Sequence, residues 1–159
     1  MLWCYLSALL FLAAGPLRAQ GQPDTVRWIS FAALEDSLAV RPKPIFIDFY
    51  TDWCTYCRKM DRVVFTDPAV VATLNAKYYA VRFNAESTTA VDFGGRTYVN
   101  DQVGQSRRPL HLVAQLLATR EGRFSAPALV FLDASFRVRE RHFRYLGPRG
   151  FLEVLEEGG

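Results

Sequence analysis

A short apolar run that leads directly into two closely spaced cysteines constrains the fold of this chain more than any other feature. Residues 45–50 read Ile-Phe-Ile-Asp-Phe-Tyr, which is almost continuously apolar and rich in β-forming side chains. Such a run is typical of a central strand that is buried on both faces of a sheet. Cys54 and Cys57 follow at once, where we expect a helix to begin and to continue to about Phe65. A buried strand that passes straight into a helix indicates an α/β fold.

Strands and helices alternate along the rest of the sequence. Ser30 is expected to cap a helix over 31–40, and Asp67 followed by Pro68 predicts a helical segment that ends near residue 75. Further strands are expected over 26–29, 78–84, 128–133 and 138–146, and further helices from Pro109 onward and around 151–155. Because parallel crossovers come first and an antiparallel pair comes last, we expect a central mixed β-sheet flanked by helices.

Residues 87–108 form a polar insert before the helix that Pro109 is expected to open, the third main helix. Inside it, the Gly94-Gly95 pair within residues 91–99 predicts a β-hairpin. The insert is long for a connection in a domain of this size. It is either a surface that recognises a partner or a cover over one edge of the sheet.

The first 21 residues have the composition of a secretory signal peptide. An apolar run over 2–14 ends at Gly15-Pro16, and the small residues Ala19 and Gly21 suit cleavage, although no Lys or Arg precedes the run. The run is shorter than the roughly 20 apolar residues that span a bilayer. We therefore expect a signal peptide over 1–21, a domain over 22–159, export to the periplasm or beyond, and no stable membrane insertion after signal removal.

Cys54 and Cys57 are the only cysteines of the expected mature chain, because Cys4 falls in the signal segment. A pair this close encloses almost no loop, so a disulfide between them adds little stability, and reactivity explains the pair better. At a helix N-terminus, free N–H groups and the helix dipole stabilise an anion and lower the pKa of the first thiol. We expect Cys54 to be the exposed nucleophile and Cys57, one turn further on, to be the shielded resolving thiol.

Charge and histidine content bear on other classes of function. The net charge is +3 and no long basic run or recognised motif is present, so no nucleic-acid partner is expected. A metal-binding module that uses the same cysteines is an alternative, and so is a non-catalytic adaptor. Structural zinc takes four ligands, and the two histidines, His111 and His142, lack ligand spacing from the pair. We expect no metal and no cofactor.

The segment Ile45–Cys57 (IFIDFYTDWCTYC) resembles the active-site strand and redox motif of the thioredoxin superfamily, and Ser125–Ala128 stands where that family carries its cis-proline loop. Phe46–Phe65, Asp67-Pro68 and the hairpin-bearing insert are more closely similar to small exported thioredoxin-like proteins, which in turn are similar to the C-terminal domain of periplasmic disulfide reductases. The resemblance covers essentially the whole expected mature chain. It implies a thioredoxin fold and disulfide exchange through a Cys54–Cys57 redox disulfide.

The resemblance also implies which residues meet the substrate. Pro127 matches the cis-proline, and the Ala126-Pro127 backbone is expected to pair with the substrate chain. Trp53 covers the edge of the site or simply packs there, and Tyr56 contacts the partner or is simply exposed. Thr55-Tyr56 contains neither the proline nor the histidine of strongly oxidising relatives. We therefore expect a reductase of disulfide-bearing exported proteins. An unidentified electron donor is expected to return its cysteine pair to the reduced state.

Asp48 lies six residues before Cys54 and matches the family's buried aspartate. A carboxylate inside an apolar strand is costly unless it has a partner or a task. One interpretation is a proton relay to Cys57 with a raised pKa. The other is an aspartate that reaches the surface at the strand end and bonds to the backbone. Arg82, on the following strand, is a candidate ion partner.

Overall fold

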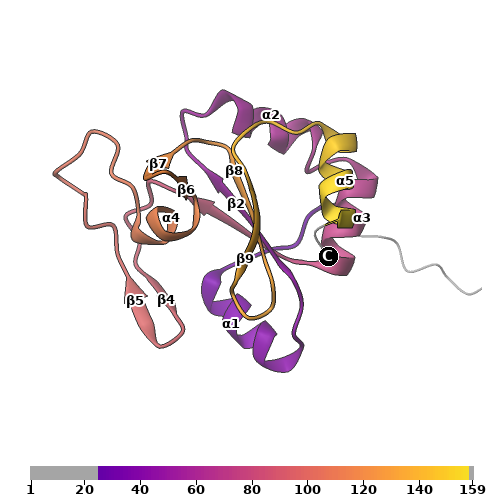
Figure 1. The fold of residues 1–159 in the computed structure, drawn as a ribbon, viewed down its shortest axis with the longest axis horizontal. Coiled ribbons are helices and arrows are strands. Elements are labelled where there is room, and N and C mark those ends of the chain that lie inside the picture. The colour runs from indigo at the N-terminus through magenta and orange to yellow at the C-terminus, as the bar shows by residue number, and fades with distance from the viewer. Residues whose placement is uncertain (1–24, 158–159) are drawn as a thin grey trace, which may run out of the picture.

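The computed structural model describes residues 25–157, so the expected signal peptide lies outside the described residues. A five-stranded sheet runs through the centre, in the order β1–β3–β2–β8–β9 (Figure 1). Its strands are β1 (Trp28–Ile29), β2 (Ile45–Tyr50), β3 (Tyr79–Asn84), β8 (Ala128–Leu132) and β9 (Val138–His142). β3 pairs in parallel with β1 and β2, whereas β8 is antiparallel to β2 and β9. The mixed sheet expected from the sequence is confirmed.

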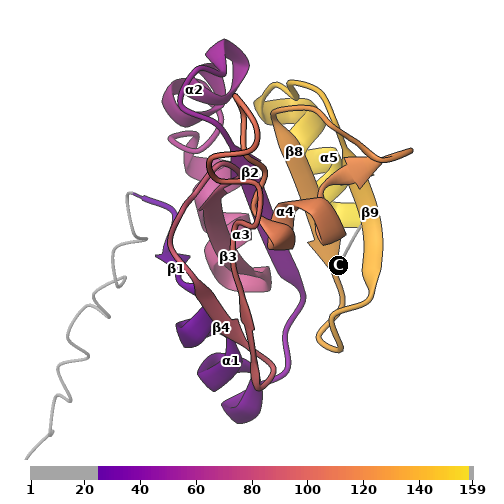
Figure 2. The ribbon, with the colours of Figure 1, turned by 90° about the vertical axis from the view of Figure 1, so that its left-hand side faces the viewer.

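Helices cover both faces of this sheet (Figures 1 and 2). They are α1 (Phe31–Val40), α2 (Thr55–Val63), α3 (Pro68–Lys77), α4 (Leu112–Leu117) and α5 (Pro148–Glu157). One apolar core lies between the sheet and α2, α3 and α5, and a second core lies between the sheet and α1 and α4. In residues 25–157, every helix is too short or too polar to cross a lipid bilayer.

The alternation of side chains along β2 decides which core each residue enters. Ile45, Ile47 and Phe49 belong to the core under α1 and α4, whereas Phe46 belongs to the core under α2, α3 and α5. Asp48 shares the parity of Phe46, so its carboxyl group is directed into the layer below α2. The strand therefore places one carboxylate among the apolar side chains beneath the cysteine-bearing helix.

Local capping residues start the helices largely where the sequence predicts. Ser30 Oγ accepts a hydrogen bond from the backbone N–H of Ala33, and Asp67 caps α3 with Pro68 in its first turn. Helix α4 begins at Leu112 rather than at Pro109, because the His111 ring caps it: Nδ1 accepts a hydrogen bond from the N–H of Val113 at 3.2 Å. That expectation of a helix opened by Pro109 is wrong.

Two further differences lie near the C-terminal half of the sheet. A small hairpin of β6 (Thr119–Arg120) and β7 (Arg123–Phe124) precedes β8, turning through Glu121 and Gly122, which both have positive φ. This hairpin was not predicted from the sequence, because only its two turn residues distinguish it from a loop. Strand β9 ends at His142, earlier than predicted. The residues that follow leave the sheet edge and pack near α2, where the Tyr145 ring lies 6.1 Å from the Tyr56 ring.

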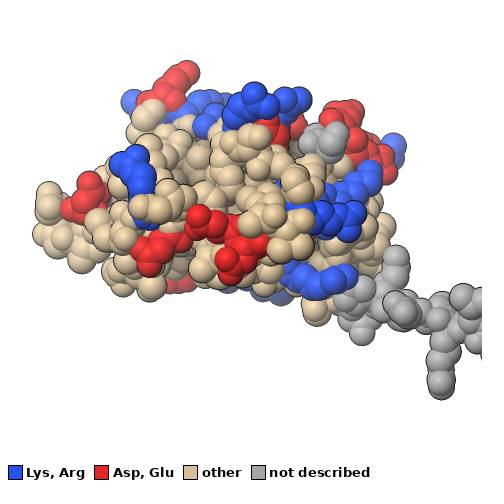
Figure 3. All heavy atoms as spheres, turned by 90° about the horizontal axis from the view of Figure 1, so that it is seen from below, with Lys and Arg blue, Asp and Glu red and all other residues tan. Residues whose placement is uncertain are grey.

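The insert carries the predicted hairpin, formed by β4 (Val91–Phe93) and β5 (Arg96–Tyr98). Gly94 and Gly95 have φ values of 60° and 69°, which a two-residue hairpin turn requires. The hairpin packs on α1, where Glu35 Oε2 accepts a hydrogen bond from the N–H of Gly94. It lies at the end of the molecule opposite to the start of α2 (Figures 1 and 2). On the face seen from below, acidic and basic side chains form several separate groups (Figure 3).

Candidate active site

The two cysteines form a disulfide at the start of α2, directly after β2. Cys54 is the N-cap residue, and its Sγ accepts a hydrogen bond from the backbone N–H of Cys57 at 3.0 Å. This contact places the first sulfur against the unpaired amide groups of the helix, where negative charge is stabilised. Cys54 is 4% exposed and Cys57 is 2% exposed. The expected difference in exposure is thus absent from the oxidised pair, because the N-cap side chain turns back over the first turn.

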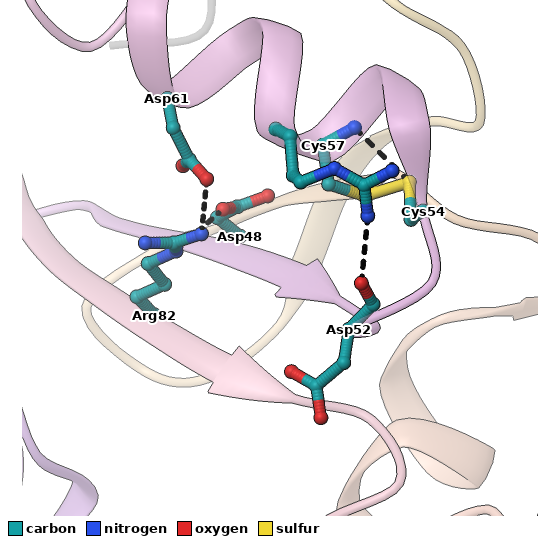
Figure 4. Close-up of polar contacts among 7 residues, drawn as sticks. Asp48, Asp52, Cys54, Cys57, Asp61 and Arg82 are labelled. Carbon is teal, nitrogen blue, oxygen red and sulfur yellow. Dashed lines mark hydrogen bonds and ion pairs between the residues drawn. A yellow bond between two sulfur atoms is a disulfide. The ribbon is translucent and has the colours of Figure 1, made fainter.

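Asp48 on β2, Arg82 on β3 and Asp61 on α2 form a charged cluster between the sheet and this helix (Figure 4). The parallel register of β2 and β3 sets Asp48 beside Arg82. Arg82 Nη2 donates to Asp61 Oδ2 on α2 at 2.7 Å, whereas Arg82 Nε lies 3.4 Å from Asp48 Oδ2. The guanidinium also lies 4.3 Å from the Tyr50 ring centre. Asp61 therefore holds the better of the two ion pairs, and Asp48 Oδ1 has no hydrogen-bond partner among the described residues.

Burial raises the pKa of the Asp48 carboxyl group to about 7, with Arg82 opposing the rise and Asp61 adding to it. At neutral pH this group exists in both protonation states, so it can take up or release a proton. Its side chain is buried and its charged neighbour is Arg82. The interpretation of Asp48 as a surface-reaching residue bonded to the backbone is therefore wrong.

Trp53 borders the disulfide on the side of the insert and is 46% exposed. Its indole Nε1 donates to Glu86 Oε1 at 3.0 Å, and the Arg108 guanidinium lies 3.9 Å from the centre of its ring. Nearby, Arg58 Nη1 donates to the backbone carbonyl oxygen of Asp52 at 2.7 Å (Figure 4). The indole of Trp53 is therefore fixed by Glu86 at its N–H edge and by Arg108 on one ring face, although the side chain is about half exposed.

Tyr56 lies on another side of the site, together with the proline loop. A hollow of about 530 Å³ is lined by Tyr56, Ser125, Ala126, Pro127, Phe143, Arg144 and Tyr145. The Ala126–Pro127 peptide bond is cis. The structure thus brings Tyr56, Ala126 and Pro127 to one hollow, whereas Trp53 lies outside its lining.

Both histidines that a metal site would need have other contacts. His111 caps α4 and is fully buried, and burial lowers the pKa of its ring. His142 Nε2 lies 2.8 Å from Glu140 Oε1. In the part of the chain from residue 25 to 157, no group of three or more His, Cys, Asp or Glu side chains is placed to hold a metal ion.

Three residues of this region were not predicted from the sequence: Asp61, Glu86 and Arg108. Asp61 follows Cys57 by four positions, so both lie on one face of α2, and this spacing was a usable signal. Glu86 and Arg108 gave no such signal, because they meet Trp53 from loops distant in the sequence.

Comparison with known proteins places these features in a family. The family model described as "Thioredoxin-like domain" matches residues 33–158. The "Thiol:disulfide interchange protein DsbD" of Pectobacterium atrosepticum is 42% identical over 41 residues, which cover 26% of this chain and 7% of that protein. The chain thus matches only a small part of the length of this curated relative.

Two solved structures share the fold. "DsbH Oxidoreductase" has a TM-score of 0.59 at 19% sequence identity, and the match covers 96% of this chain and 94% of that one. The oxidised C-terminal domain of DsbD from Neisseria meningitidis has a TM-score of 0.55 at 19% identity, over 80% of this chain and 91% of that one. At these identities the matches show the fold alone.

Proposed function

The chain belongs to the thioredoxin-like domain family, and on that premise we propose that it is an exported thiol–disulfide oxidoreductase that reduces protein disulfides through Cys54 and Cys57. The observation that carries the proposal is the Cys54–Cys57 disulfide at the N-terminus of α2, with Sγ of Cys54 against the N–H of Cys57. The name of the DsbD relative, a thiol:disulfide interchange protein, supports the same chemistry. The signal-like composition of residues 1–21 supports export.

The first step is attack by the reduced protein on a disulfide of the partner. The Cys54 thiolate, stabilised at the helix N-terminus, bonds to one partner sulfur. The partner's S–S bond breaks, and its other sulfur leaves as a thiolate that takes up a proton. The product is a mixed disulfide between Cys54 and the partner.

The second step releases the partner. Cys57 gives its proton to Asp48, and its thiolate attacks Sγ of Cys54. The Cys54–Cys57 disulfide forms, the mixed disulfide breaks, and the second partner sulfur leaves and is protonated. Two electrons have then passed to the partner. A thiol-bearing donor restores the reduced pair by the reverse exchange.

The partner protein is expected to bind in the hollow beside the cis Ala126–Pro127 bond. Ala126 and Pro127 are assigned to pair with the partner's extended backbone, and Tyr56 to pack against it, because these residues line one hollow. Trp53 is assigned to a part of the site outside this hollow.

The test is reduction of a protein disulfide such as that of insulin by the reduced protein, with Cys54→Ser as the inactive variant. The potential of the pair, titrated against glutathione, is expected at about −270 to −200 mV. A potential near about −120 mV would identify an oxidase instead. Full occupancy by a metal together with no reduction of insulin would support the metal-binding alternative.

A further inference from the structure

The end of the insert returns to the active site through ordered contacts. Asn100 is buried, and its Nδ2 donates both to the carbonyl of Ser87 at 3.0 Å and to that of Pro109 at 2.9 Å. The N–H of His111 donates to the carbonyl of Ala85 at 2.8 Å. These bonds close the base of the insert, so its last residue, Arg108, occupies a defined place beside the loop that carries Trp53.

Arg108 contacts Trp53 over the face of its indole ring. Its guanidinium carbon lies 3.9 Å from the centre of the indole ring, while Glu86 holds the indole N–H on the ring edge. A guanidinium stacked on an aromatic face keeps its in-plane N–H donors free for another group. Arg108 is therefore oriented by Trp53 without its hydrogen-bonding capacity being used.

Arg107 and Arg108 are exposed, and within residues 25–157 neither side chain has an ion-pair or hydrogen-bond partner. With Ser106 they line an open hollow of about 550 Å³. We call these three residues the arginine surface. The acid that shares Trp53 with Arg108 is Glu86, and its Oε1 accepts a hydrogen bond from the indole N–H rather than from either arginine.

We propose that the arginine surface docks an acidic segment of the disulfide-bearing partner protein. Two neighbouring guanidinium groups with free donors match carboxylates, which they bind through paired N–H···O contacts. Because Arg108 lies on Trp53, next to Cys54 in the sequence, the docked segment sits close to the attacking sulfur. The inference rests on the proposed function and adds the chemistry of the partner.

The test uses three synthetic peptide disulfides that differ only in the residues flanking the cysteine: acidic, neutral or basic. The second-order rate constant of exchange with the reduced protein is measured for each at low salt and at about 1 M salt, where the Debye length falls to about 3 Å. We expect the acidic peptide to react fastest at low salt and this preference to shrink at high salt.

In Arg108→Ala, the ratio of acidic to neutral rate constants is expected to fall about fivefold, which corresponds to about 1 kcal/mol. Arg96→Ala is the matched control. It removes the same charge from the same insert, at the hairpin on the opposite end of the molecule, and should leave the ratio unchanged (Figures 1 and 2).

An unchanged ratio in Arg108→Ala, or equal rates for all three peptides with the parent protein, would overturn the docking surface. A dimer of the parent protein that Arg108→Ala dissociates would assign the surface to a second copy of this chain and would overturn it too. If the reduced protein exchanged with none of the peptides and not with hydroxyethyl disulfide, the proposed function itself would fail, which is a separate result.

Discussion

Asp61 on α2 holds the Arg82 guanidinium of β3 at 2.7 Å, and this contact takes the arginine's best hydrogen bond away from Asp48. Asp48 is left 3.4 Å from Arg82 Nε, with one carboxylate oxygen unpartnered among the described residues. A fully paired carboxylate would be ionised well below neutral pH, whereas a buried and poorly paired one is not. Burial therefore raises the pKa of Asp48 to about 7, and Asp61 contributes to the rise by its own charge and by engaging Arg82, whose guanidinium would otherwise lower it further.

Asp61→Asn is expected to move the pH dependence of mixed-disulfide release to lower pH. The substitution removes a negative charge that raises the pKa of Asp48 and frees Arg82 to pair with Asp48 more closely. Release is followed by stopped flow from a preformed mixed disulfide across pH 5–9. Asp61→Glu, which keeps the charge, should retain the parent profile. A profile for Asp61→Asn that matches the parent would show that Asp61 does not tune Asp48.

Asp48→Asn is expected to slow release of the mixed disulfide about 100-fold, because Cys57 loses its base. Formation of the mixed disulfide should change little, since Cys54 relies on the helix N-terminus rather than on Asp48. Single-turnover measurements separate the two steps. Equal slowing of both steps would argue for a general disturbance of the site, and unchanged release would leave Asp48 without a role in proton transfer.

The oxidised protein is expected to lose stability as the pH rises from about 4 to above 7. The pKa of Asp48 lies near 7 in the folded protein against 3.8 for an ordinary carboxyl group, so the folded state binds its proton more tightly. Stability from this group is therefore full at low pH and is lost as the carboxyl ionises, on the order of 4 kcal/mol in total. Urea midpoints at several pH values measure this, and Asp48→Asn should flatten the dependence. A parent protein whose stability rose across this range because of Asp48 would contradict the expectation.

In the reduced protein, Cys54 is expected to react with iodoacetamide at neutral pH much faster than Cys57. Its sulfur accepts a hydrogen bond from a helix N–H and lies at the positive end of the helix dipole, which stabilises the thiolate, whereas Cys57 lies inside the first turn of α2. Mass spectrometry of briefly alkylated protein locates the modified thiol. Faster labelling of Cys57 would reverse the two roles.

Several features of the fold and site follow from local sequence. The apolar run of β2, the cap residues Ser30 and Asp67, and the Gly94-Gly95 turn each act through neighbouring residues, so their elements appear where predicted. The start of α4 differs, because an N-cap is decided by which side chain reaches the helix amides. Here the His111 side chain caps α4, and the sequence around His111 did not predict this cap.

The sequence by itself determined the order of the central strands and main helices, the cysteine pair at a helix start and the position of a carboxylate within the apolar strand before it. All of these depend on periodicity and spacing along the chain. Only the tertiary structure decided that Asp61 competes with Asp48 for Arg82, and that Arg108 of the insert lies on Trp53. The physical reason is that these contacts join residues from separate strands, helices and loops. Their geometry is set by strand register and by the packing of loops, which no local pattern encodes.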